Sequence, residues 1–303
     1  MRIVVVDIGG TCIKSGIWIE GKLRALKECE TQARKGGEHV LLRVIELIKE
    51  YEAFDAIGIS TAGQVDRDNG CIRYANENIP GYTGMPVRER LEQYFKVPVV
   101  VENDVNAAAI GEAFFGGGRD VKDFLCLTYG TGIGGAIILN QQIYTGLSYS
   151  AGEFGSMIIH PEDRVEGEYF SGCYEKYAST TALVASAKQY DKNLTNGRAI
   201  FERIEERAIE EIVQNWIQEM TYGLINLIHI FNPPCIVLGG GILSQPYVVE
   251  HLQQKVYSQI MPSFKGVVLK RAELGNQAGL FGMVHLVESL VMERGEAKCL
   301  REI

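Results

Sequence analysis

Several patterns that would assign a function at once are missing from this chain of 303 residues. Its seven cysteines are scattered and never form a C-x-x-C pair, so neither a disulfide framework nor a zinc ribbon is indicated, and we expect reduced thiols. Apolar runs stay below the roughly 18 residues of a membrane span, and the first strand follows Met1 without a basic signal region. We therefore expect a cytoplasmic protein without a membrane partner. The Walker pattern G-x-x-x-x-G-K-[ST] is also absent.

The chain has no excess of positive charge. It carries 38 Asp and Glu residues against 30 Lys and Arg residues, for a formal net charge of −8. Proteins that bind nucleic acid usually present a basic face, so we expect no nucleic-acid partner. Glycine, in contrast, is abundant: 34 of the 303 residues are glycine, which is above the usual share of about 7%. We expect the extra glycines in loops that approach a ligand closely.

Alternating strand and helix patterns predict an α/β fold, and the length suggests two domains. The predicted strands are 3–8, 12–20, 23–30 (after a turn at Gly21-Lys22), 55–60, 97–104, 124–140 (a strand pair) and 235–242, and the predicted helices are 37–51, 105–115, 207–231 and 278–293. Residues 124–140 repeat the strand, glycine turn and strand of 3–20, which suggests two related halves. The glycine run 116–118 marks the boundary. We predict an N-terminal domain over 1–118, joined by a C-terminal helix at 286–303, and a larger domain over 119–285.

Glycine turns follow three predicted strands, directly after Asp7, at 130–135 and at 239–241. Backbone N–H groups in such turns form anion sites, and glycine lets phosphate oxygens approach the main chain. Residues 130–135 also satisfy the dinucleotide pattern G-x-G-x-x-G, with Glu153 near the place where a ribose-binding acid is sought. That pattern must open a helix, whereas here a strand continues. The turns therefore favour phosphate sites over a dinucleotide site.

Acidic residues stand where two of the strands end. A carboxylate among phosphates makes sense if Mg²⁺ lies between them, since Mg²⁺ takes few protein carboxylates and keeps several waters. Asp7 would then steer Mg²⁺; the alternative is that it only caps a turn. Asp104 could accept a proton from a substrate hydroxyl that attacks phosphorus, could be the N-cap of the helix 105–115, or could do both.

Eight motifs in order along almost the whole chain resemble the ROK family of sugar kinases and sugar-responsive repressors. The motifs are DIGGT (7–11), TAGQVD (61–66), NIPGY (78–82), ENDVNAAAIGE (102–112), LTYGTGIGGAI (127–137), AGEFGSM (151–157), GCYEKYAS (172–179) and GGGI (239–242). The resemblance implies an α/β fold of two ribonuclease-H-like domains, as in the actin-like ATPases, around a cleft that closes on the sugar. It also implies a homodimer.

The resemblance further implies roles for individual residues. Asp104 would be the catalytic base, and Asp7 would bind Mg²⁺ through water. The sugar site would contain Gly63, Asn78, Asn103, Asp104, Glu153 and Glu175. ATP would be bound by Gly9, Gly10, Thr11, Lys14, Thr131 and Gly132, with Gly239, Gly240 and Gly241 bordering the adenosine.

Many family members hold a structural zinc with one histidine and three cysteines. Aligned without gaps, these positions are Ser156, Glu166, Glu168 and Cys173. Structural zinc favours four Cys or His ligands, so this set is a poor one and we expect no structural zinc. The loop 156–173 must then be held by packing or by a partner subunit. The nearby His160 is a lone histidine, which is more often a surface or core residue than a replacement ligand.

Within the zinc-less branch, FLCLTYGTGIGG, AGEFGSM and GNQAGLFG look most like the β-glucoside kinase subgroup. This resemblance implies ATP-dependent phosphorylation of a hexose, at the 6-hydroxyl of the non-reducing glucose of a disaccharide such as cellobiose. A kinase of glucose, fructose or N-acetylmannosamine would carry the same phosphate machinery.

Three further classes of protein are less well supported. A non-catalytic sugar sensor would be expected to lose the base, yet Asp104 is present. A DNA-binding repressor would carry a helix-turn-helix before DIGGT, whereas here the strand begins at once. A general actin-like or chaperone ATPase is disfavoured by the sugar cluster.

Overall fold

The computed structural model describes residues 1–299, and the side chains up to residue 292. The chain divides into two compact units. The first contains Met1–Arg119, Thr145–Ala151 and the chain from Asn276 onward; the second contains Asp120–Tyr144 and Gly152–Gly275. The end of the predicted closing helix, 300–303, lies outside the described residues. Within the described part, no helix is long and apolar enough to cross a membrane.

The first unit is built on a five-stranded sheet with the order β3-β2-β1-β4-β7. Its strands are β1 (Ile3–Ile8), β2 (Cys12–Ile19), β3 (Lys22–Glu30), β4 (Ala56–Thr61) and β7 (Val99–Asn103), with a separate hairpin of β5 (Gln64–Asp66) and β6 (Cys71–Tyr74). Its helices are α1 (Gly37–Lys49), α2 (Val87–Phe95), α3 (Asp104–Phe115) and α9 (Ala278–Cys299), with the short η1 (Ala33–Lys35). A 3₁₀ turn, η6 (Gly275–Gln277), precedes α9.

The second unit repeats this plan with the order β10-β9-β8-β11-β12. Its strands are β8 (Phe124–Tyr129), β9 (Ile133–Leu139), β10 (Gln142–Ile143), β11 (Cys235–Gly239) and β12 (Val268–Arg271). Its helices are α4 (Tyr174–Ala178), α5 (Thr180–Tyr190), α6 (Gly197–Phe201), α7 (Arg207–Phe231) and α8 (Pro246–Gln259), with the 3₁₀ turns η2 (Phe154–Ser156), η3 (Pro161–Asp163), η4 (Gly241–Ser244) and η5 (Pro262–Phe264).

The two sheets share both strand order and strand direction. In each sheet the first three strands form an antiparallel meander, and the remaining two pair in parallel. The glycine turns take equivalent places, between Ile8 and Ile13 in the first sheet and between Tyr129 and Ile133 in the second. The predicted repeat of strand, glycine turn and strand is therefore confirmed.

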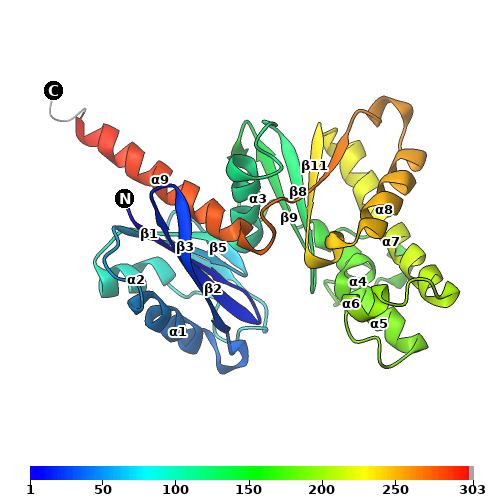
Figure 1. Ribbon diagram of the computed structural model, residues 1–303, viewed down its shortest axis with the longest axis horizontal. Helices are drawn as coiled ribbons and strands as arrows, with labels where there is room; N and C mark the ends of the chain where they lie inside the picture. The colour runs from blue at the N-terminus through cyan, green and yellow to red at the C-terminus, as the bar shows by residue number, and fades with distance from the viewer. Residues whose placement is uncertain (300–303) are drawn as a thin grey trace. The chain divides into compact units, whose positions relative to one another are not determined.

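Strand β1 is apolar throughout because both of its faces are covered. Val4, Val6 and Ile8 pack into a core that includes the buried faces of α1 and α2, whereas Ile3 and Val5 pack into a second core with α9. Figure 1 shows α1 and α2 next to this sheet and α9 alongside α3. Side chains alternate across a strand, so Asp7 lies on the same face as Ile3 and Val5, which is the face towards α9.

Glycine allows α9 to approach both α3 and the sheet. A Cβ on Gly282 would lie 1.8 Å from the carbonyl oxygen of Ala107, and one on Gly111 would lie 2.2 Å from that of Ala278. On β4, a Cβ on Gly58 would lie 2.8 Å from the Cβ of Met283. These contacts are backbone to backbone or backbone to Cβ, so no side-chain rotation can relieve them.

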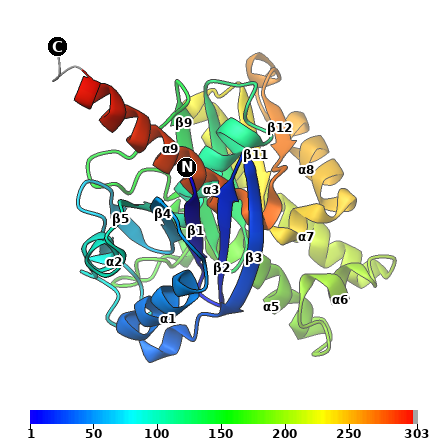
Figure 2. The ribbon, with the colours of Figure 1, turned by 60° about the vertical axis from the view of Figure 1, so that its left-hand side comes forward.

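In the second unit the long helix α7 carries the predicted wide buried face, and Figure 2 shows it beside α8 next to β11 and β12. The ring of Tyr174 packs on Gly223 of α7, where a Cβ would lie 2.1 Å from the ring. The Tyr174 hydroxyl lies 2.7 Å from that of Tyr129 and donates to the carbonyl of Met220 at 2.7 Å. This buried pair of tyrosines fixes α4 beside the glycine turn that follows Tyr129.

We predict that Gly282→Ala destabilises the first unit, because α9 must move away from α3. Overpacking of this kind costs about 1–3 kcal/mol, or several degrees in the midpoint of thermal unfolding. Calorimetry on the full chain measures this shift. Gly266→Ala is the matched control, since a Cβ at Gly266 meets nothing within 4 Å. Equal midpoints for the two variants would contradict the packing argument.

Candidate active site

Three parallel strands of the first unit bring polar side chains to one edge of its sheet. The register pairs Asp7 of β1 with Ser60 of β4, and Ser60 with Glu102 of β7. Asn103 and Asp104 follow directly at the junction of β7 and α3. Ligands of α/β proteins bind at the carboxyl ends of parallel strands, so this edge is the candidate active site.

Asp7 is held by the sheet and does not cap the glycine turn. The Ser60 hydroxyl donates to Oδ1 of Asp7 at 2.6 Å, and Lys14 is the residue opposite Asp7 on the neighbouring strand β2. Burial raises the pKa of Asp7, while the Ser60 hydrogen bond and the Lys14 charge oppose that rise. The turn is closed by the amide of Gly9, which donates to the carbonyl of Cys12 at 3.0 Å.

Asp104 is the first residue of α3, and the helix cap is its neighbour. The Oδ1 atom of Asn103 accepts from the amides of Val105 and Asn106, so the alternative that Asp104 is the N-cap is wrong. The N-cap residue stands just before the first turn of a helix, and from this position the short Asn103 side chain can reach the free amides of that turn. Burial, followed by the charge of Asp7, raises the pKa of Asp104 to about 7. A carboxylate with this pKa is suited to accept a proton near neutral pH.

The side chain of Asn103 has all of its hydrogen-bonding positions occupied. Its Oδ1 accepts two amide hydrogens, while its Nδ2 donates to the carbonyl of Gly63 at 2.9 Å and to Oδ1 of Asp104 at 3.0 Å. An amide side chain has two donors and two lone pairs, so this set is complete. Its predicted contact with a sugar hydroxyl stays a prediction, and would require one of these bonds to be exchanged.

Asp7 and Asp104, the two carboxylates at this edge of the sheet, fit a magnesium ion. The charge of Asp7 contributes to the raised pKa of Asp104, so the two groups repel one another and a divalent cation would relieve that repulsion. Groups of three or more His, Cys, Asp or Glu side chains that could hold a metal do not occur among the described side chains. Mg²⁺ needs no such cage, because it binds to one or two carboxylates and to substrate phosphates.

The glycine turn of the first unit leaves backbone amides accessible at its tip. Gly10 and Thr11 are exposed, while Thr31 ties the base of the turn through its hydroxyl to the Gly9 carbonyl at 2.6 Å and through its amide to the Thr11 carbonyl at 2.8 Å. The tip is therefore fixed in place yet open to an anion.

The corresponding turn of the second unit carries exposed Thr131 and half-buried Gly132. The carboxylate of Glu175 lies over this turn, where its Oε2 would be 2.6 Å from a Cβ on Gly132 and accepts weakly from the amide of Ile133 at 3.4 Å. The structure therefore brings together two predicted ligands, Gly132 for phosphate and Glu175 for sugar.

Among the three glycines at the end of β11, the backbone itself requires Gly240. Its φ is +112°, and a Cβ there would lie 2.2 Å from the carbonyl oxygen of Tyr129. A Cβ on Gly241 meets nothing within 4 Å, so that position is open to a ligand. Gly239 ends the strand in contact with Thr128 of β8. Their predicted contact with adenosine stays a prediction.

Glu153 and Ser156 lie on a segment that packs against the glycines of β9. A Cβ on Gly135 would lie 2.3 Å from the carbonyl oxygen of Gly152, and one on Gly155 would lie 2.3 Å from that of Ile133. Glu153 and Ser156, which flank the buried Phe154 and Gly155, are exposed. In the first unit Gly63 has a φ of +98° and accepts from Asn103, whereas Asn78 is exposed on a separate loop.

Two members of this edge were missed in the sequence, Ser60 and Arg67. Ser60 ends a short strand that is parallel to the strand of Asp7, and its polarity at that position was the available signal. Arg67 reaches the buried Glu102, with Nε 2.7 Å from Oε2. A single arginine in a polar loop gives no signal in the sequence for such a contact.

The loop 156–173, where the resemblance would have placed a zinc site, is organised here by an arginine. The guanidinium of Arg164 donates from Nη1 to the carbonyls of Glu168, Tyr169 and Ser171 at 3.2, 3.1 and 2.8 Å. The Ser171 hydroxyl also accepts from the amide of Val165 at 2.9 Å. One planar cation thus gathers three carbonyls of the same loop.

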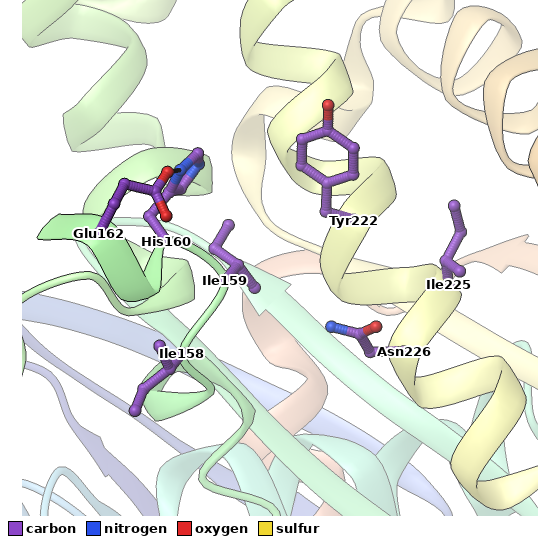
Figure 3. Close-up of a pocket in the computed structure, with 7 residues that line it drawn as sticks. All are labelled: Ile158, Ile159, His160, Glu162, Tyr222, Ile225 and Asn226. Atoms are coloured by element: carbon purple, nitrogen blue, oxygen red, sulfur yellow. Dashed lines mark hydrogen bonds and ion pairs between the residues drawn. The ribbon is translucent and has the colours of Figure 1, made fainter. Parts of the chain in front are cut away.

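At the base of this loop His160 joins the segment to α7. Its Nδ1 lies 2.9 Å from Glu162 and its Nε2 lies 2.8 Å from Glu219, and hydrogen bonds to the two carboxylates raise its pKa against the opposing effect of burial. Figure 3 shows His160 and Glu162 on one side of a pocket and Tyr222 of α7 on the other. His160 is therefore a partly buried structural residue, and nothing among its described contacts marks it as a replacement ligand.

We predict that Arg164→Ala loosens the loop 165–171 without unfolding the unit, because the three carbonyls lose their shared donor. Amide hydrogen exchange of this loop should become at least about tenfold faster, while exchange in α7 stays unchanged. A chelator should not alter the exchange of the parent protein. The exposed Arg198 supplies the control variant, Arg198→Ala. A chelator effect on the parent would instead indicate a metal in the loop.

We predict that Asp104→Asn removes a pH-dependent loss of stability. The folded carboxyl keeps its proton up to about pH 7, whereas an unperturbed Asp side chain has a pKa of 3.8. The folded state therefore binds more protons in this window, and its stability falls as the pH rises through it. In a chelator, the variant should unfold at a higher temperature than the parent near pH 8 and have no such advantage near pH 4. The same difference at both pH values would contradict this.

Two α/β units of the same strand order, each with a glycine turn after its first strand, and a carboxyl whose pKa is raised to about 7 are features that suit a phosphoryl-transfer enzyme. A model of the ROK family matches residues 3–289. A β-glucoside kinase of Listeria monocytogenes is 32% identical over 94% of this chain and 97% of its own. A glucokinase of Thermotoga maritima is 30% identical over 96% and 98%.

A solved structure agrees with these relatives. The ROK glucokinase of Streptomyces griseus, in complex with glucose and AMPPNP, has a TM-score of 0.82 and 29% identity, and the match covers 94% of this chain and 99% of that one. The chain therefore belongs to the ROK family, and the predicted fold of the actin-like ATPases is confirmed. It is an ATP-dependent carbohydrate kinase.

Proposed function

We propose that the enzyme transfers the γ-phosphate of ATP to the 6-hydroxyl of a hexose, and that this hexose is the non-reducing glucose of a β-glucoside such as cellobiose. The observation that carries the chemistry is the pair Asp7 and Asp104 at the ends of β1 and β7, with the pKa of Asp104 raised to about 7. The choice of sugar rests on motifs and on the β-glucoside kinase relatives.

In this proposal Asp104 accepts the proton of the attacking hydroxyl. The sugar oxygen forms a bond to the γ-phosphorus, the bond from phosphorus to the bridging oxygen breaks, and ADP leaves with that electron pair. Asp7 would hold Mg²⁺ through water, and the bound ion would neutralise part of the phosphate charge. We place a phosphate site of the first unit at the amides of the exposed Gly10 and Thr11, near Lys14 on β2.

The remaining sugar ligands are proposed from the second unit. Glu153 is exposed at the start of η2, and Glu175 lies over the turn at Gly132. At Ser156, where zinc-bearing members have a histidine, the side chain is small and exposed. A small residue near the anomeric end of the sugar leaves room for a second sugar ring, which favours a disaccharide.

A kinase of a simple hexose is the second candidate. The relative from Thermotoga maritima and the structure from Streptomyces griseus are glucokinases at 30% and 29% identity, so these comparisons favour glucose almost as strongly. A kinase of fructose or an N-acetylhexosamine would use the same carboxylates. A sugar sensor without kinase activity is an alternative from a different class of protein. Such a sensor would not need the raised pKa of Asp104.

The experiment is ADP release from ATP and Mg²⁺ with glucose, fructose, mannose, N-acetylmannosamine, N-acetylglucosamine, cellobiose and gentiobiose. We expect the highest kcat/KM with a disaccharide. Asp104→Asn should lower kcat by about 10²–10⁴-fold while calorimetry still detects sugar binding, because the variant loses the base and keeps the hydrogen-bond geometry.

Each other result points to one alternative. A response to a single monosaccharide would overturn the disaccharide and keep the kinase. Full turnover by Asp104→Asn would overturn the role of Asp104 as base. Sugar binding without ADP release from any sugar would favour the sensor.

A further inference from the structure

A buried ion pair joins the strand of the base to the hairpin loop next to it. The Glu102 side chain is 1% exposed and that of Arg67 is 31% exposed, and Nε of Arg67 lies 2.7 Å from Oε2 of Glu102. Burial raises the pKa of Glu102, and the Arg67 charge opposes this rise. A carboxylate so well buried is costly unless it is paired, so Arg67 is its necessary partner.

The other carboxylate oxygen of Glu102 is connected through Asn103 to Asp104, the proposed base. Its Oε1 accepts from the amide of Asn103 at 2.9 Å and from Nδ2 of Asn106 at 3.0 Å. Asn103 then donates to Oδ1 of Asp104 and to the carbonyl of Gly63. The ion pair of Arg67 with Glu102 is therefore continued by hydrogen bonds from Glu102 through Asn103, and these contacts hold both the turn at Gly63 and the carboxylate of Asp104.

A second arginine holds the same loop by a different route. Arg88 donates to the carbonyls of Arg67 and Asp68, both at 2.6 Å, and to the carbonyl of Val99 at the start of β7 at 3.1 Å. It fastens the loop backbone but does not contact Glu102 in any described bond. Two arginines thus hold this loop, and among their described contacts only those of Arg67 connect to Asp104.

We propose that Arg67 is a positioning residue for phosphoryl transfer, which aligns the Asp104 carboxylate with the sugar-facing turn at Gly63 through Glu102 and Asn103. The inference rests on the proposed role of Asp104 as the base. Misplacement of a reacting group by about 1 Å can cost about 10²-fold in rate, so a small displacement of this network is enough to matter.

The test is steady-state kinetics of Arg67→Met with the best sugar of the panel. We expect kcat to fall by about 10–100-fold and the KM for sugar to rise, with the KM for ATP unchanged, since the network does not reach the glycine turn at Gly10. Arg67→Lys should recover part of kcat, because an ammonium can still pair with Oε2 as a point charge. The exposed Arg34 provides the control Arg34→Met.

Two further variants separate positioning from general stability. The double variant Arg67→Met/Glu102→Gln removes the uncompensated buried charge, so its thermal midpoint should return towards that of the parent while the KM for sugar stays raised. Arg88→Met should raise the KM for sugar and leave kcat near that of the parent. Recovery of kinetics together with stability in the double variant, or a loss of kcat in Arg88→Met equal to that in Arg67→Met, would overturn the proposal.

Failure of this inference can be distinguished from failure of the proposed function. An inactive Asp104→Asn combined with parental kinetics for Arg67→Met would reject the positioning role alone. Full activity of Asp104→Asn would reject the base, and with it the reason for a positioned carboxylate.

Discussion

Parallel pairing of β1 with β4 and of β4 with β7 is the constraint on which the candidate site depends. It puts Asp7, Ser60 and Glu102 in one row and starts α3 immediately after that row. Two carboxylates, Asp7 and Asp104, are thereby brought close enough for the charge of one to raise the pKa of the other. Such proximity is unfavourable for folding, and it occurs where we propose the cation site and the base.

Much of the fold could be predicted from the sequence because its signals are local. The apolar strand 3–8, the spacing of α7 and the second glycine turn each predict an element at the observed place. The N-cap of α3 was less certain, since Asn103 and Asp104 are both good capping residues and stand next to each other. Only the geometry of the helix start decides between them.

The contacts of the site were harder to predict for a physical reason. Ser60 and Asp7 are separated by 53 positions, and Arg67 lies in the turn after β5 whereas its partner Glu102 is in β7. Such pairs depend on register and on the path of a loop, which one sequence does not reveal. The same holds for Arg164, whose three acceptors are backbone carbonyls and have no residue signature.

The position of α9 has a consequence for how the protein is made. The first unit needs Leu280, Met283, Val284 and Val287 to cover one face of its sheet, yet these residues lie beyond the whole second unit in the chain. During synthesis at about 5–20 residues per second, that face waits on the order of ten seconds for its cover. The nascent first unit therefore has one apolar face of its sheet uncovered until α9 has been translated.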